Sequence, residues 1–273
     1  MAKSIDFSVI APPTYLDTFV AQAPARVHHV AAQRVLSDET YRAFFAREAE
    51  NGAEIIVDNG VFDLGHALPA ADLVAAGRAV GAREIILPDV MRDGAATVKA
   101  SEQAAREIRD LAGDAFRLCA VLHAADDEEW LRTYDALVTG DYAGAIALPA
   151  SRRPDPDGQL CRNRWAATAY LEDRGMVEDR IVYRLLGLGR TGHLELFQQR
   201  EHEWISSVDG AAPVILGAMG IALLLEGPYE KPSTPRIEKL GPIPEDRFGL
   251  IRRNIAVVRA AAGSSVQIAE ARR

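Results

Sequence analysis

The chain has 273 residues and a net charge of −8, and 48% of its residues are hydrophobic. This composition excludes wholesale disorder, and no apolar run reaches the roughly 18 residues of a transmembrane helix, so no membrane partner is expected. The first residues lack the layout of a signal peptide, and the two cysteines, Cys119 and Cys161, are too few for a disulfide framework, so we expect a cytoplasmic protein.

Short β-branched runs alternate with longer amphipathic segments along the whole chain. In chain order, the predicted strands are Asp6–Ile10, Arg26–Val30, Glu54–Val57, Glu84–Leu87, Arg117–Leu122, Gly144–Leu148, Arg180–Leu186 and Trp204–Val208. The predicted helices are Ser37–Asn51, Ala70–Val80, Ala95–Leu111, Asp126–Val138, Arg164–Arg174, Gly192–His202 and Glu245–Ala262. This alternation predicts the α/β class and a single (β/α)8 barrel (TIM barrel) domain over residues 1–273.

Two polar stretches interrupt the alternation. Residues 151–164 are rich in proline, glycine and arginine, and residues 226–244 carry several prolines. We interpret both as loop insertions rather than as linkers, because either side alone would hold an incomplete barrel. Long loops at the C-terminal face of a barrel often carry function.

Three predicted strands run directly into an aspartate: Asp58, Asp89 and Asp209. A carboxylate in this position often caps the next helix. The C-terminal ends of parallel barrel strands lie on one face, however, so three such residues together predict a shared site. Glycosyl chemistry suits them, because one carboxylate can attack an anomeric carbon, a second can carry a proton and a third can bind the N–H groups of a base.

The histidines and glycines leave other interpretations open. His28 and His29 are adjacent, so they point to opposite faces of a strand, and His123 ends a predicted strand in the expected pocket. A metal-dependent barrel hydrolase would draw its ligands from His29, His123 and Asp209, although no dense ligand motif accompanies them. Residues 187–189 (GLG) resemble half of a phosphate loop and are more typical of a tight turn.

Over most of the chain, these segments resemble the tRNA-guanine transglycosylase superfamily in the same order. Residues 56–62 (IVDNGVF) resemble its Asp-Ser-Gly-Gly-Phe/Tyr-Gln strand end, and residues 86–89 (ILPD) resemble the strand whose aspartate binds the exchanged base. Residues 185–189 (LLGLG) resemble Leu-Met-Gly-Val-Gly, and residues 207–210 (SVDG) stand where the family has Met-Phe-Asp-Cys. In residues 119–123 (CAVLH) a histidine replaces a base-reading glutamine, and residues 145–148 (AIAL) lack the glycines of Gly-Gly-Leu, so only main-chain contacts would carry over there.

The resemblance implies a role for each matching residue. Asp209 is the expected covalent nucleophile, and Asp58 is the expected proton-transfer residue. The residues expected to surround the substrate base are Asp89, Asn59, Gly60, Phe62, His123, Ile146, Ala147, Leu186 and Gly187. No metal ion or other cofactor is expected.

The departures from the family pattern point to DNA as the partner. The tRNA enzymes carry a zinc-binding subdomain with a Cys-x-Cys-x2-Cys…His motif after the nucleophile, whereas this sequence has no cysteine after Cys161. The short barrel is similar to the DpdA-type phage DNA-guanine transglycosylases, which implies a location in the host cytoplasm if a phage encodes the chain. The implied enzyme is a pentosyltransferase that exchanges guanine in DNA for a 7-deazaguanine, with 7-cyano-7-deazaguanine as the expected base.

Contact with DNA is expected from local arginines, because the chain as a whole is acidic. These are Arg152, Arg153, Arg162, Arg164 and Arg190, with Arg252 and Arg253 as further candidates. Three alternatives stay open at this point: a tRNA-directed transglycosylase, the metal-dependent hydrolase, and a barrel that binds nucleobases or DNA without catalysis. The sequence leaves open which 7-deazaguanine is preferred, which DNA sequence is chosen and which oligomer forms.

Overall fold

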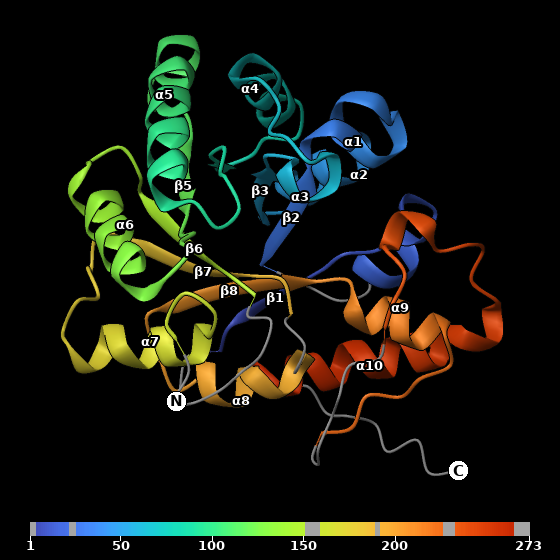
Figure 1. Cartoon of the computed structure of the whole chain (residues 1–273). Helices are drawn as coiled ribbons and strands as arrows, with labels where there is room; N and C mark the ends of the chain where they lie inside the picture. The colour runs from blue at the N-terminus through green and yellow to red at the C-terminus, as the bar shows by residue number, and fades with distance from the viewer. Residues whose placement is uncertain (1–3, 22–25, 151–158, 189–191, 226–232, 265–273) are drawn as a thin grey trace.

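The strands of the chain form one eight-stranded parallel sheet that curls around a central axis (Figure 1). The computed structural model describes residues 4–21, 26–150, 159–188, 192–225 and 233–264. The strands are β1 (Asp6–Val9), β2 (Val27–Ala31), β3 (Glu54–Asp58), β4 (Glu84–Ile86), β5 (Arg117–Val121), β6 (Ala145–Pro149), β7 (Val182–Leu186) and β8 (Ile205–Gly210). Every predicted strand is confirmed, with ends that differ by at most two residues.

The sheet order β1-β8-β7-β6-β5-β4-β3-β2 follows the chain around a nearly closed barrel. Its two ends, β1 and β2, meet at a seam where the Oγ of Ser8 accepts a hydrogen bond from the N–H of His29 at 2.9 Å. The predicted (β/α)8 barrel is therefore confirmed. Because all strands run in the same direction, their C-terminal ends share one face.

The helices surround the strands (Figure 1). They are α1 (Ala32–Ser37), α2 (Glu39–Glu50), α3 (Val61–Leu64), α4 (Ala70–Ala79), α5 (Gly94–Ala112), α6 (Asp127–Thr139), α7 (Arg164–Asp173), α8 (Leu196–Gln199), α9 (Ala212–Ala218) and α10 (Phe248–Ala261). Within the described residues, no helix is both long enough and apolar enough to cross a bilayer.

The predicted helices are confirmed with local corrections. The helix expected from Ser37 begins after Asp38, whose carboxylate caps it by accepting the N–H of Tyr41 at 3.0 Å. The last two predicted helices open with 3-10 turns, Gly192–Glu195 and Glu245–Arg247. Sequence analysis missed α1, α3 and α9, because segments of four to seven residues are too short to show an amphipathic repeat.

Of the two loop insertions, the described parts lack strands and long helices. Residues 233–244 contain only the 3-10 turn Ile237–Lys239, and residues 159–163 form a turn before α7. The remainder of both insertions, residues 151–158 and 226–232, lies outside the described residues.

An irregularity in β8 decides where Asp209 points. The pairing with β7 skips Ser206, so β8 carries one extra residue there. Before the skip, Ile205 packs in the helix-facing cluster, whereas after it Ser207 bonds Arg184 inside the barrel at 2.8 Å. In a regular strand Asp209 would share the outer face of Ile205. The bulge therefore turns Asp209 inward.

A buried ionic cluster fills the barrel interior below the site. Arg184 of β7 donates to Glu84 through Nε and Nη2 at 2.6 and 2.8 Å, and to Glu54 through Nη2 at 2.7 Å. Arg117 donates to the same two glutamates at 2.9 and 3.1 Å. The side chains of Arg184 and Glu84 are at most 1% exposed. Four charges thus connect β3, β4, β5 and β7 through the interior, where an unpaired charge costs several kcal/mol.

We expect the substitution Glu84→Gln to lower the free energy of unfolding by about 3 kcal/mol, because it leaves a buried guanidinium incompletely neutralised. Urea denaturation followed by circular dichroism measures this change. The matched control is Glu128→Gln, which removes the partner of Arg132 on the exposed side of α6 and should cost less than about 1 kcal/mol. Equal losses in the two variants would contradict a stabilising role for the cluster.

Candidate active site

Five strand ends contribute to one site at the C-terminal face of the barrel. Asp58 ends β3 and Asp209 lies near the end of β8, while the other three residues lie one to three positions after β4, β5 and β7. These three are Asp89, His123 and Gly187. The structure thus brings together the residues that sequence analysis expected to share a site.

Asp58 has an unusual proton affinity. Its Oδ1 accepts the N–H of Gly60 at 2.8 Å, and Gly60 has a φ of 88°, which glycine adopts without strain. Burial, assisted by the negative charges of Asp209, Asp63 and Asp89, raises the pKa of Asp58 to about 7, although the bond from Gly60 acts in the opposite direction. Such a carboxyl group is divided between its two forms near neutral pH, so it can both give and take a proton.

Asp89 is fixed at both of its oxygens. Oδ1 accepts a hydrogen bond from Nδ2 of Asn59 at 2.7 Å, and Oδ2 lies 2.8 Å from Nε2 of His123. Asn59 is itself fixed, because its amide donates to the carbonyl of Leu87 and accepts the N–H of Val61. One network therefore joins the loops after β3, β4 and β5. Each carboxylate oxygen can accept a second hydrogen bond, so Asp89 can still bind the N–H of a ligand.

Among the described residues, a backbone N–H group holds Asp209. Its Oδ1 accepts the N–H of Gly187 at 2.8 Å, and Gly187 has a φ of 71°, again in the region that glycine favours. The other oxygen, Oδ2, makes no hydrogen bond within the described part of the chain. Asp209 is thus oriented through one of its two oxygens.

Arg164, which we expected to contact nucleic acid, is buried instead. Its guanidinium pairs with Glu195 at 2.7 and 2.9 Å, and it donates to the carbonyls of Leu186 and Gly187 at 3.0 Å each. With 3% exposure it cannot reach a polyanion. It holds the end of β7, and with it the N–H that orients Asp209.

The other predicted arginine contacts divide into two groups. Arg162, Arg252 and Arg253 are exposed, so they remain candidates for contact with DNA. The remaining three lie outside the described residues: Arg152, Arg153 and Arg190.

The remaining base-binding predictions have different outcomes. Ala147 and Leu186 line the barrel interior, and their contact with a base stays a prediction. Side chains alternate along β6, so that of Ile146 points into the helix-facing cluster, and the expected contact with the base would come from its main chain. Phe62 lies at the rim with 71% exposure, and its ring lies beneath the guanidinium of Arg236 at 5.5 Å.

His29 is a site-facing residue whose role sequence analysis did not resolve. It is 7% exposed, and its Nε2 has no hydrogen-bond partner among the described residues. Burial lowers its pKa, while the nearby charge of Asp209 acts in the opposite direction. The alternation of His28 and His29 predicted that one of them points inward, but only the strand register identifies which one.

The ligands expected for a metal-dependent hydrolase do not form a metal site within the described residues. Within the ranges that the structure describes, no group of three or more His, Cys, Asp or Glu side chains is arranged to hold a metal ion. His29, His123 and Asp209 are therefore not gathered as ligands.

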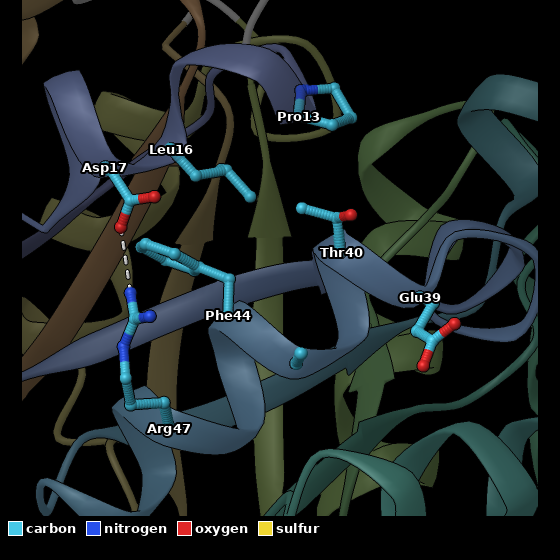
Figure 2. Close-up of a pocket in the computed structure, with 8 residues that line it drawn as sticks. Pro13, Leu16, Asp17, Glu39, Thr40, Phe44 and Arg47 are labelled. Carbon is cyan, nitrogen blue, oxygen red and sulfur yellow. Dashed lines mark hydrogen bonds and ion pairs between the residues drawn. The ribbon is translucent and has the colours of Figure 1, made fainter.

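A cleft of about 320 Å³ is lined by residues of the first two turns of the chain and of α2 (Figure 2). It separates the turns at Pro13–Tyr15 and Leu16–Val20 from α2, and Asp17 and Arg47 pair beside it at 2.9 Å. None of the three strand-end aspartates lines it, so it is distinct from the candidate site.

No protein-family model and no curated protein sequence matches the chain. Among solved structures it is similar to KGPDC from Streptococcus mutans, with 13% identity, a TM-score of 0.49 and coverage of 95% of this chain and 99% of that one. A putative phosphonomutase from Burkholderia cenocepacia J2315 has 16% identity, a TM-score of 0.47 and coverage of 80% and 91%. A putative dihydrodipicolinate synthetase from Pseudomonas aeruginosa has 13% identity, a TM-score of 0.45 and coverage of 79% and 72%. One fold can host many unrelated functions, so an assignment of chemistry to this barrel depends on its own residues.

Proposed function

We propose that this chain is a DNA-guanine transglycosylase, a pentosyltransferase that exchanges guanine in DNA for a 7-deazaguanine, with 7-cyano-7-deazaguanine as the expected base. The proposal rests on one observation: the three carboxylates at the C-terminal face of the barrel differ in their hydrogen bonds and in their proton affinity. Asp209 is oriented through one of its two oxygens, Asp58 has a pKa near neutrality, and Asp89 is fixed as an acceptor. Base exchange requires these three properties in a nucleophile, a proton carrier and a base reader.

The first half-reaction releases guanine. Oδ2 of Asp209 attacks C1′ of a deoxyguanosine, and a C1′–O bond forms as the C1′–N9 bond breaks. The departing guanine takes the electron pair of that bond together with the proton of Asp58. The products are free guanine, a covalent deoxyribosyl-aspartate and an ionised Asp58.

The second half-reaction restores both aspartates. The incoming base gives its N9 proton to Asp58 and attacks C1′ from the face that guanine left, which displaces Asp209. Two inversions retain the β configuration of the nucleoside. No metal ion or redox cofactor takes part in either step.

Asp89 would bind both bases in the same way. Guanine and 7-deazaguanine share an edge with two adjacent N–H donors, and a carboxylate can accept from both. Asn59 and His123 hold Asp89 in one orientation, which favours one position of the base. A pocket for a single base requires the target nucleotide to leave the duplex, at a cost of a few kcal/mol.

The central test is the incorporation of labelled guanine or 7-cyano-7-deazaguanine into DNA and tRNA, side by side. Asp209→Asn should reduce incorporation about 1,000-fold or more, because an amide cannot attack C1′. The variant is well matched, since its amide oxygen can still accept the N–H of Gly187. Label in tRNA instead of DNA would keep the chemistry and change the partner, whereas incorporation into neither by the folded wild-type protein would overturn the proposal and favour a barrel that only binds.

The pH dependence should follow the raised pKa of Asp58, which is about 7. Guanine release needs the protonated form, so its single-turnover rate should fall as pH rises through about 7; capture of the incoming base needs the ionised form and should slow as pH falls through the same value. Asp58→Asn should remove both dependences and slow exchange about 100-fold or more. Quenched-flow measurements from about pH 5.5 to 8.5 test this expectation.

Asp63→Asn provides the matched control for this profile. Removing its negative charge should lower the pKa of Asp58, because that charge contributes to the rise. The pH dependences of guanine release and of base capture should therefore both persist, with their midpoints at a lower pH. A profile of wild-type shape in Asp58→Asn would assign the proton transfer to another group.

A further inference from the structure

Exposed apolar side chains gather on the face of the barrel that carries the site. Among the described residues, the exposed large hydrophobic side chains are Leu36, Phe62, Leu64, Val90, Met91, Leu111, Met219 and Leu224. All except Leu111 lie between the end of a strand and the long helix that follows it, in the loops and the short helices α1 and α3 that follow strand ends at the C-terminal face. Leu111 lies at the far end of α5, towards the opposite face.

The turn between β4 and α5 presents two exposed apolar side chains, Val90 and Met91, next to Asp89. The N–H of Asp93 donates to the carbonyl of Val90 at 3.2 Å and closes the turn. Thr97 fixes it from α5, because its Oγ1 accepts the N–H of Val90 at 2.9 Å and donates to the carbonyl of the same residue at 3.0 Å. The turn is therefore a fixed projection and not a loose loop.

The tip of this turn combines an apolar and a cationic side chain. Met91 is 61% exposed, and the neighbouring Arg92 is also exposed. Arg92 has a φ of 63°, a left-handed conformation that is uncommon outside glycine and that costs about 1 kcal/mol or more. Such strain is retained where the surroundings or a function require one particular orientation.

Positive charge is also present at the next loop of the rim. The exposed Arg236 donates to the carbonyl of Asp63 at 3.4 Å and lies over the ring of Phe62. Two exposed guanidinium groups beside apolar side chains suit a partner that offers phosphates outside and stacked bases inside.

This inference rests on the proposed function: we propose that Met91 is a wedge that enters the base stack of duplex DNA beside the target guanosine, while Arg92 binds an adjacent phosphate. Extruding a base leaves a gap in the stack, and apolar side chains such as methionine fill gaps of this kind. Met91 follows Asp89 by two residues, at most about 7 Å along the backbone. The residue that would bind the extruded base and the residue that would occupy its place therefore belong to one rigid segment.

The first experiment measures duplex opening directly. A duplex oligonucleotide carries 2-aminopurine next to the target guanine, and this base becomes more fluorescent when it is unstacked. Saturating wild-type protein should raise the fluorescence, and Met91→Ala should lose most of the rise, about fivefold or more. Leu111→Ala removes another exposed apolar side chain, which lies towards the opposite face, and should behave as wild type. Equal fluorescence with Met91→Ala and wild type would overturn the inference.

The second experiment separates this inference from the proposed function. Exchange is compared on a duplex and on the same target guanine in a single strand, where no stack has to be opened. Met91→Ala should lower the duplex-to-single-strand rate ratio about tenfold, whereas Leu111→Ala should not change it. No exchange by wild type on either substrate would refute the function, while the fluorescence would still test the wedge. An unchanged ratio in Met91→Ala would refute the wedge alone.

A second copy of the chain is the competing occupant of this surface, and a measurement of the oligomeric state tests for it. Sedimentation of wild type and Met91→Ala without DNA should give the same molecular mass. A loss of self-association in the variant, with duplex opening unchanged, would assign the exposed side chains to contact between copies of the chain and overturn the inference.

Discussion

The buried ion pair between Arg184 and Glu84 is the interaction on which the rest of the structure depends. Together with Glu54 and Arg117 it connects four strands through the barrel interior, at a depth where neither charge could stay unpaired. Three of these strands are held at their first residue and β7 at its middle residue, and each is only three to five residues long, so their C-terminal ends are placed as well. A second buried pair, Arg164 with Glu195, holds the opposite end of β7 through backbone carbonyls.

The same kinds of residue behave differently at the two ends of the barrel. In the ionic cluster of the barrel interior, the glutamates pair with arginines, which neutralise the carboxylate charge. At the C-terminal face, the hydrogen bonds that the structure describes to the three aspartates come from backbone N–H groups, an amide and an imidazole. The backbone N–H groups that bond Asp58 and Asp209 orient these carboxylates without supplying the full positive charge of an arginine. Burial and mutual repulsion can therefore raise the pKa of Asp58, which makes this residue suitable for moving a proton.

This difference between the two ends of the barrel explains why the barrel architecture alone does not identify the reaction. Similar barrels support many chemistries, and the difference lies in the strand-end residues and the loops that surround them. Here the proposed nucleophile, proton carrier and base reader lie on β8, β3 and the loop after β4. The rigid turn with Met91 continues directly from the last of these, so recognition of a base and opening of a duplex would be coupled through one segment.

The sequence by itself determined the eight strands and the three aspartates at their ends, because alternation of apolar runs and the position of a carboxylate after such a run are local properties. It also determined that a glycine follows Asp58 closely, as the left-handed turn at Gly60 requires. Only the tertiary structure decided which way the side chains point and with what they pair. The bulge at Ser206 turns Asp209 inward, the register of β6 turns Ile146 outward, and Arg184 meets a partner 100 residues away in the chain. The physical reason is the same in each case: side-chain direction and charge pairing depend on how neighbouring strands align, and that alignment is not encoded in any short segment.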